Sequence, residues 1–179
     1  MKKSGLLTFL LLGNILLFGQ QADSLQKVQH QQNFLSVYRY ALQYDDMGTA
    51  AYALTNYLMQ GGSANFKDTL ALVYYRTNNL NGAYRLAKEI QEADVKNVTA
   101  LSLLADITGR AGDTKSSLEW YEKLTAVAPS PFNFYQLATR QFLLERLGEC
   151  RSTLQKVIAD SAQARDQQVT LEITAGNSE

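Results

Sequence analysis

Few side chains in this sequence have the chemistry that catalysis or metal binding requires. The 179 residues include one histidine, His30, and one cysteine, Cys150. A zinc or iron–sulfur site needs about four such ligands, so sites of these kinds are excluded. A single cysteine also cannot form a disulfide within the chain. We therefore expect neither a metal nor another cofactor.

The individual candidates for catalysis are better explained by structure. His30 lies in a Gln-rich stretch, residues 26–32, where an exposed residue near a helix start is expected. Asp45 and Asp46 are neighbours in a predicted turn, and adjacent carboxylates point apart and usually cap a helix. The Gly-Arg-Ala-Gly stretch at residues 109–112 lacks the Lys-Ser/Thr ending and preceding strand of a phosphate-binding loop. The sequence predicts a protein that is not an enzyme.

Charge and composition narrow the class of partner. The 17 Lys and Arg residues balance the 17 Asp and Glu residues, so the formal net charge is zero. A neutral chain lacks the basic surface that concentrates nucleic acid or anionic lipid, so we expect no nucleic acid as a partner. Two prolines and 46% hydrophobic residues favour a mostly helical globular protein.

Residues 1–22 have the layout of a secretory signal peptide. Two lysines precede an uncharged, Leu-rich run over residues 6–18, and Gly19 and Ala22 are small residues suited to cleavage. The run of about 13 residues spans roughly 20 Å as a helix, against ~30 Å of hydrocarbon, so a retained membrane anchor is the weaker alternative. The short Lys-Lys start is typical of bacterial export signals. We expect a periplasmic or cell-envelope protein that contacts the membrane only through this segment before cleavage.

The remainder of the chain is periodic. Blocks that begin at Gln31, Ala64, Val98 and Pro131 follow one another at intervals of 33 or 34 residues, the period of a helix-turn-helix repeat. Similar residue types recur at positions 7, 8, 24 and 27 of the blocks. Position 20 is always small, which lets antiparallel helices approach closely; its occupants are Ala50, Ala83, Ser117 and Cys150. We expect each of the four, Cys150 included, to be buried, and each block to form one antiparallel helix pair.

In this pattern the sequence resembles the tetratricopeptide repeat (TPR) family. The third block is the clearest copy, and the matching residues are Leu101, Leu104, Ala105, Gly112, Asp113, Ser117, Tyr121, Leu124 and Pro129. The other blocks are degenerate, since Lys67 occupies a usually apolar position and Gln141 a usually aromatic one. The resemblance implies an all-α, right-handed solenoid of antiparallel helix pairs, with a four-helix bundle of accidental periodicity as the alternative.

The expected organisation is set by the period. It comprises a signal peptide at 1–22, a polar lead-in at 23–30 and four TPR-like repeats within 31–165, at 31–63, 64–97, 98–130 and 131–163. Residues 164–179 are then either a capping helix or the start of a fifth repeat in a longer protein.

The resemblance also implies a concave face lined by the first helices of successive repeats. The candidate binding residues carried over to this face are Arg39, Asp68, Tyr75, Arg76, Asp106, Arg110, Tyr135 and Phe142. Arg76 and Arg110 share position 13 in adjacent blocks, so together they could bind a carboxylate; the alternative is that both are ordinary charges favoured at helix ends. Tyr75, Tyr135 and Phe142 offer rigid apolar area of the kind found at interface hot spots.

These observations predict a non-catalytic scaffold that binds protein or peptide in the bacterial cell envelope. The alternative is a docking or regulatory N-terminal part of a larger envelope enzyme or transport machine that continues past residue 179. The sequence leaves open which partner is bound and whether the protein is oligomeric.

Overall fold

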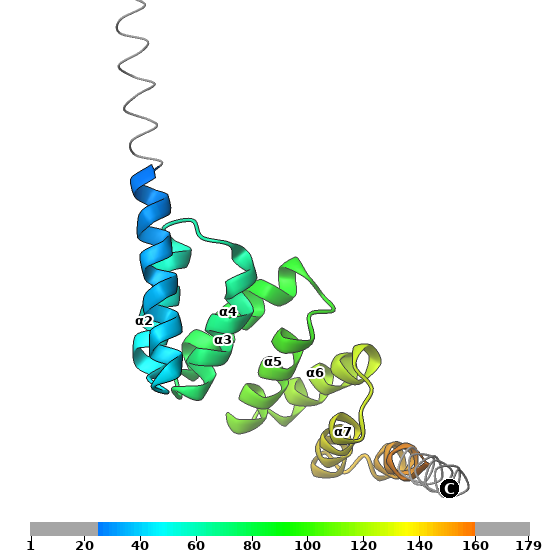
Figure 1. The fold of residues 1–179 in the computed structure, drawn as a ribbon. Coiled ribbons are helices and arrows are strands. Elements are labelled where there is room, and N and C mark those ends of the chain that lie inside the picture. Colours follow the sequence, from blue (N-terminus) through cyan, green and yellow to red (C-terminus); the bar gives the residue numbers. More distant parts are fainter. Residues whose placement is uncertain (1–24, 160–179) are drawn as a thin grey trace, which may run out of the picture. The chain divides into compact units, whose positions relative to one another are not determined.

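A computed structural model describes residues 25–159 (Figure 1). These residues form α-helices joined by short turns, and none of them is in a β-strand. They fall into two compact units, one ending at Thr77 and the other beginning at Asn78, and each is described by itself. The expected signal peptide at 1–22 and the expected capping helix or fifth repeat at 164–179 lie outside the described residues.

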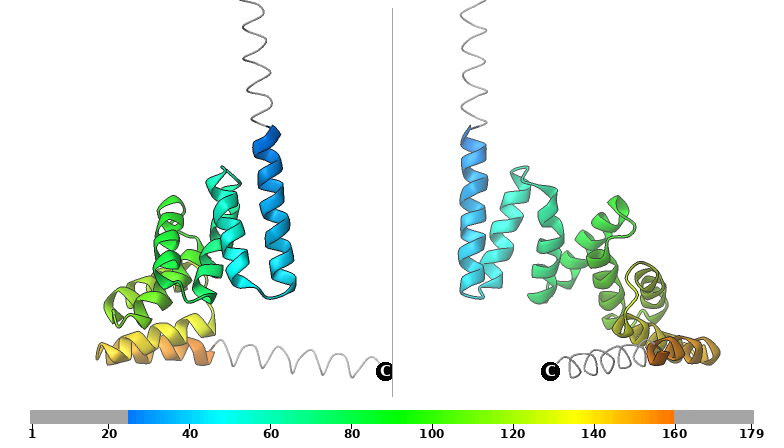
Figure 2. Two further views of the ribbon diagram at one scale, coloured as in Figure 1. Left: turned by 90° about the vertical axis from the view of Figure 1, so that its left-hand side faces the viewer. Right: turned by 45° about the vertical axis from the view of Figure 1, so that its right-hand side comes forward.

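The first unit contains a helical segment over residues 25–43, α2 (Met47–Met59), the 3₁₀ turn η1 (Ala64–Phe66) and α3 (Lys67–Arg76). The first segment and α2 run side by side in both views of Figure 2. The Gln31 side-chain amide donates to the Gln60 carbonyl oxygen across 2.7 Å, which joins the two helices. The helix is continuous through residues 25–30, so this part of the expected polar lead-in belongs to the helix of the first block, and His30 is exposed on it.

Aromatic rings and small residues hold the first unit together. Ala50 and Leu54 of α2 are completely buried, as expected for the small position 20 and the recurring position 24. The Phe66 ring of η1 lies edge-on to Tyr57, with ring centroids 5.2 Å apart, and also contacts Tyr38 at 6.3 Å. Edge-to-face contacts of this kind add stability beyond the area they bury. The second block is thereby fixed onto the first.

The second unit comprises α4 (Leu80–Ala93), α5 (Val98–Arg110), α6 (Thr114–Val127), α7 (Pro131–Leu143) and a helical segment over residues 147–159. Helices α5 and α7 begin at the first residues of the third and fourth blocks. Both starts are capped, because the Asn97 side chain accepts from the Ala100 amide and the Ser130 side chain from the Asn133 amide. Pro131 suits the first position of α7, where no amide hydrogen is needed.

One residue in the middle of each block reverses the chain. Position 15 has a positive φ in all four blocks, at Asp45 (53°), Asn78 (59°), Gly112 (81°) and Glu145 (60°). Position 16 then caps the second helix, where Asp46, Asn79 and Asp113 accept from the amides of Thr49, Gly82 and Ser116. The pKa of Asp46 and of Asp113 is lowered by these caps. The largest cause is a hydrogen bond from the side chain of Thr49 or Ser116, respectively, and the backbone amide of the same residue adds to it. In the fourth block Arg146 replaces the cap, and its guanidinium instead pairs with Glu149 across 2.7 Å.

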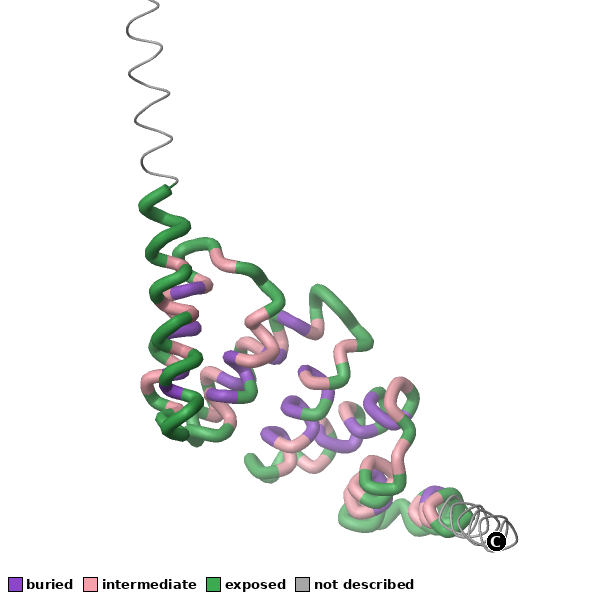
Figure 3. The backbone as a smooth tube through the Cα atoms, viewed as in Figure 1, coloured by how far each residue is buried: buried purple, intermediate pink, exposed green. Residues whose placement is uncertain are grey.

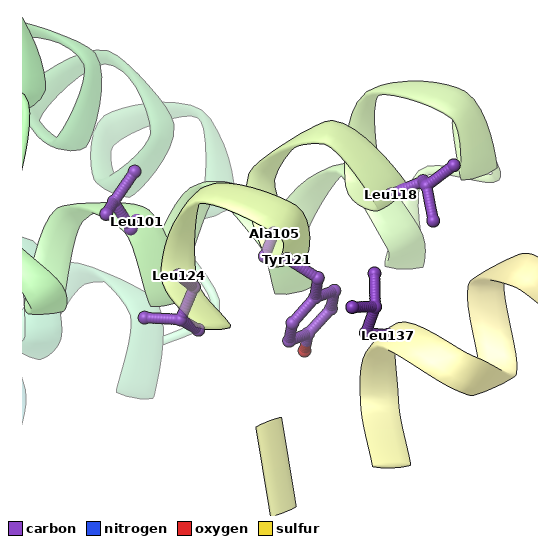
Figure 4. Close-up of a cluster of buried hydrophobic side chains, with 6 residues drawn as sticks. All are labelled: Leu101, Ala105, Leu118, Tyr121, Leu124 and Leu137. Atoms are coloured by element: carbon purple, nitrogen blue, oxygen red, sulfur yellow. The ribbon is translucent and has the colours of Figure 1, made fainter. Parts of the chain in front are cut away.

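The core of the second unit lies among α5, α6 and α7. Its buried residues are Leu101, Ala105, Leu118, Tyr121, Leu124 and Leu137 (Figure 4). Ser117 is completely buried at the small position 20 and donates to the Ala105 carbonyl oxygen at 2.7 Å. In Figure 3, buried residues, coloured purple, recur along α5 and α6.

Burial weakens in the fourth block. Cys150, Leu154 and Val157 occupy positions 20, 24 and 27 and are only half-buried, although their counterparts in the third block are buried. The expectation that Cys150 would be fully buried is therefore wrong. Position 20 contacts both its own block and the next one, and no described element comes after residues 147–159 to complete the burial.

Candidate functional site

An open hollow lies between α7 and the helical segment 147–159. Its volume is about 280 Å³, and it is lined by Tyr135, Ala138, Thr139, Phe142, Cys150 and Leu154. Most of this lining is apolar and none of it carries a formal charge. The hollow is the candidate functional site because two of the predicted binding residues, Tyr135 and Phe142, lie at it together.

The helical period places these side chains on one face. Tyr135, Ala138 and Phe142 are spaced three and four residues apart on α7, so they line up along the helix. Cys150 and Leu154 are four apart on the next helical segment and face the same space. Tyr135 is 57% exposed and Phe142 is 61% exposed. Two large, exposed rings thus line the hollow together with Ala138, Thr139, Cys150 and Leu154.

The chemistry available in the hollow is that of apolar contact. The Thr139 hydroxyl donates to the Tyr135 carbonyl oxygen at 2.9 Å, so its hydrogen is already used within the helix. Cys150 is the single thiol, and no general base stands among the lining residues. Across residues 25–159 no group of three or more His, Cys, Asp and Glu side chains is arranged to hold a metal ion. The hollow suits the apolar side chains of another polypeptide.

The other predicted binding residues are distributed over both units. Asp106 and Arg110 lie on α5 in the second unit, together with Tyr135 and Phe142 on α7. The remaining predicted residues, Arg39, Asp68, Tyr75 and Arg76, belong to the first unit. A groove that joins the two groups stays a prediction.

Arg76 and Arg110 both bind the turn of the preceding block. The Arg76 Nη2 lies 3.3 Å from Asp45 Oδ1, and the Arg110 Nη2 donates to Asn78 Oδ1 at 3.2 Å. Position 13 of one block therefore contacts position 15 of the block before it in both cases. This repeated contact favours a structural role at the helix ends, while shared binding of a carboxylate stays a prediction. Where the fourth block follows the third, Leu143 occupies position 13 and Gly112 occupies position 15, so neither side chain of this contact is present.

Three lining residues, Ala138, Cys150 and Leu154, were not among the predicted binding residues. A signal for them exists in the sequence, because they occupy positions 8, 20 and 24, which recur as packing positions in every block. These positions become binding candidates only where no further repeat covers them. Whether they are covered is seen from the packing of the helices and not from the sequence.

A second hollow has a different character. It is lined by Lys115, Leu118, Glu119, Glu122, Leu144 and Arg146. Two of its charges are paired with each other, since Arg146 Nη1 lies 3.6 Å from Glu122 Oε1. Such a surface is more typical of solvated helix faces than of a binding site.

Within residues 25–159, no helix has both the length and the hydrophobicity to span a bilayer.

Comparison with known proteins establishes the fold. No family model matches the chain, and no curated protein matches its sequence. Among solved structures, MamA is 12% identical with a TM-score of 0.66, covering 76% of this chain and 81% of MamA. A tetratricopeptide repeat protein from Parabacteroides merdae is 18% identical with a TM-score of 0.64, covering 83% of this chain and 61% of that one. MamA from Desulfovibrio magneticus RS-1, from residue 41 to its end, is 13% identical with a TM-score of 0.64, covering 73% and 75%. The predicted all-α, TPR-like fold is confirmed.

Proposed function

We propose that this protein is a non-catalytic scaffold that binds another protein or peptide through its TPR-like repeats, in the bacterial cell envelope. The observation that carries the binding proposal is the apolar hollow flanked by the exposed rings of Tyr135 and Phe142. Aromatic residues beside a hollow are the side chains that contribute most of the affinity at protein interfaces. The TPR-like fold supports this proposal because it presents successive helices as an extended surface.

The size and lining of the hollow indicate what it binds. Small-molecule sites typically enclose about 300 to 1,000 Å³ and surround their ligand. This hollow is smaller, at about 280 Å³, and open to solvent. It is therefore suited to apolar side chains that project from a larger partner. The uncharged lining offers no counter-ion, so a charged side chain at that point would lose its hydration without compensation.

The envelope location rests on the N-terminal sequence. The Lys-Lys start, the Leu-rich run over 6–18 and the small residues at Gly19 and Ala22 support export and cleavage. N-terminal sequencing of the protein from a fractionated bacterium tests it. We expect a start at Gln20 or Asp23 in the periplasmic fraction, and an intact Met1 in the cytoplasmic fraction would contradict export.

The binding function is tested with a matched set of variants. The protein captures its partner from an envelope extract, and the purified partner is then titrated against Tyr135→Ala, Phe142→Ala and Tyr84→Ala. Loss of a hot-spot ring costs about 2 kcal/mol, which is roughly a thirtyfold loss of affinity, so the first two variants should bind at least that much more weakly. Tyr84 is an exposed tyrosine of α4 that does not line the hollow, so its variant should bind like the parent. Equal weakening by all three variants would show that the hollow is not the site.

A further inference from the structure

The way α7 packs on the third block shows what the hollow is built to receive. Among the residues of that block that lie against α7 are Ala105, Gly109, Ser117 and Tyr121, which occupy positions 8, 12, 20 and 24. Arg140 of α7 donates from Nε to Ser117 Oγ at 3.2 Å, and its guanidinium lies 5.0 Å from the centre of the Tyr121 ring. Leu137 joins the buried cluster beside Tyr121 (Figure 4).

The hollow is the same surface one repeat later. Positions 8, 12, 20 and 24 of the fourth block are Ala138, Phe142, Cys150 and Leu154, and all four line the hollow. In the third block these positions are covered by the first helix of the next repeat. In the fourth block they are open among the described residues. The hollow is therefore a receiving surface for the first helix of a further repeat.

The first helical segment of the chain carries the matching docking face. Helix α7 and the residue that follows it present Leu137, Arg140 and Leu144 to the third block, and these are positions 7, 10 and 14. The same positions of the first block are Val37, Tyr40 and Tyr44, which are 41%, 61% and 68% exposed. The Tyr40 and Tyr44 rings lie 4.7 Å apart, so they form one continuous aromatic surface. We call these three residues the docking face.

The contact between α7 and the third block is called the internal junction. The hollow and the docking face each differ from their counterparts at this junction, and the two differences match each other. In the hollow, Cys150 and Leu154 replace Ser117 and Tyr121, which removes the oxygen and the aromatic face that Arg140 uses. On the docking face, Tyr40 replaces the arginine itself. The cation and its acceptors are thus both absent, and an apolar contact takes their place.

We propose that a second copy of this chain docks Val37, Tyr40 and Tyr44 onto the hollow lined by Phe142, Cys150 and Leu154. The repeats of one molecule then continue into the repeats of the next. This inference rests on the proposed function, because it names the partner of the same hollow. The contact is head-to-tail, so each added molecule brings a new open hollow, and growth continues unless the assembly closes on itself.

The test is a complementation experiment with Tyr40→Glu and Phe142→Glu. The full protein, in the processed form that expressing cells yield, is followed by sedimentation velocity over a range of concentrations. Each variant alone should associate at least about thirtyfold more weakly than the parent, as expected for loss of a hot-spot residue. An equimolar mixture should form dimers that do not grow, because the hollow of Tyr40→Glu accepts the docking face of Phe142→Glu. Both positions are exposed, so circular dichroism should show unchanged helix content, and Tyr84→Glu should associate like the parent.

Three results would overturn the inference. A parent protein that stays monomeric at its highest soluble concentration excludes a second copy as the partner; if deletion of residues 160–179 then restores association, the chain's own tail occupies the hollow. Association that Phe142→Glu leaves unchanged indicates contact between two docking faces. A mixture that stays monomeric when each variant alone is monomeric excludes head-to-tail pairing. If the monomeric parent still binds a different protein in a Phe142-dependent manner, the proposed function holds and the self-association fails.

Discussion

The substitution Gly109→Ala tests how the third and fourth blocks are joined. Gly109 is in the last turn of α5, and alanine in place of glycine within a helix usually stabilises by up to about 1 kcal/mol. At this position an added Cβ would lie 2.9 Å from Arg140 Nη2 and 3.0 Å from Ser117 Oγ. Ser117 cannot yield, because it is completely buried and bonded to the Ala105 carbonyl oxygen. Arg140 must therefore move.

When Arg140 moves, it loses two contacts. Their combined contribution to the free energy of unfolding exceeds the gain in helix propensity. Its hydrogen bond to Ser117 is charge-assisted, a class worth about 1.5 to 3 kcal/mol, and its position over Tyr121 is worth about 0.5 to 1 kcal/mol. Arg140 is half-buried, so the low end of each range applies. The loss is then about 2 kcal/mol against a gain of about 1, and we expect net destabilisation of about 1 kcal/mol. For a domain of about 150 residues this lowers Tm by roughly 2 to 4 °C.

The assay is urea denaturation of Gly109→Ala in the parent and in an Arg140→Met background. With methionine at position 140 no guanidinium opposes the new methyl group, so Gly109→Ala should become neutral or stabilising. The coupling between the two sites should be about 1 kcal/mol or more, as found for residues in contact. If Gly109→Ala stabilised the parent by the full helix-propensity gain, Gly109 would not be required for the approach of Arg140, and our account of the junction would be wrong.

Three further predictions concern the turns, the caps and the hollow. Glu145→Gly should raise the free energy of unfolding by about 1 kcal/mol, because Glu145 has a φ of 60° that glycine adopts without strain, whereas Glu149→Gly within the following helix should lower it; thermal melts that reverse this order would contradict the turn assignment. Asp113 has a lowered pKa, so its carboxylate stabilises the folded state above the ordinary pKa near 3.8 and loses this effect as pH falls through the folded-state value; the stability difference between the parent and Asp113→Asn should therefore vanish in acid, and a constant difference would refute the assignment. Cys150→Leu should be tolerated within about 1 kcal/mol because it extends into the open hollow, while Ser117→Leu at the equivalent buried position should cost about 1 to 3 kcal/mol by overpacking, and equal melting temperatures would show that Cys150 is as enclosed as Ser117.

The fold was predictable because its requirements recur at a fixed spacing. Each helix pair needs a small residue where the helices cross, and Ala50, Ala83 and Ser117 satisfy this need and are completely buried. The first residues of the third and fourth blocks, Val98 and Pro131, are also the first residues of α5 and α7. These features depend on neighbours that are close in sequence, so the period alone reveals them.

The candidate site was predicted only in part, for reasons of packing. Tyr135 and Phe142 were identified from their positions on the first helix of the fourth block, but Cys150 was assigned to the core. Its position in the block is the same as that of buried Ser117, and its exposure depends on whether another helix packs over it. The contacts of Arg76 and Arg110 could not be predicted from the sequence either. They require the left-handed conformation of the turn residues that the two arginines bind, Asp45 and Asn78.

Packing and binding in a repeat protein draw on the same residue positions, so residue type decides between the two roles. At the internal junction, Gly109 leaves space for an arginine, Ser117 accepts its hydrogen bond, and the Tyr121 ring contacts its guanidinium. This junction is selective because an incoming helix without the cation would leave the Ser117 oxygen without its charged donor. At the hollow, Phe142 occupies the position of Gly109 and is 61% exposed, and the uncharged lining offers no counter-ion for a cation. Selectivity at the hollow must then come from shape, and paired aromatic residues such as Tyr40 and Tyr44 have the rigidity to provide it.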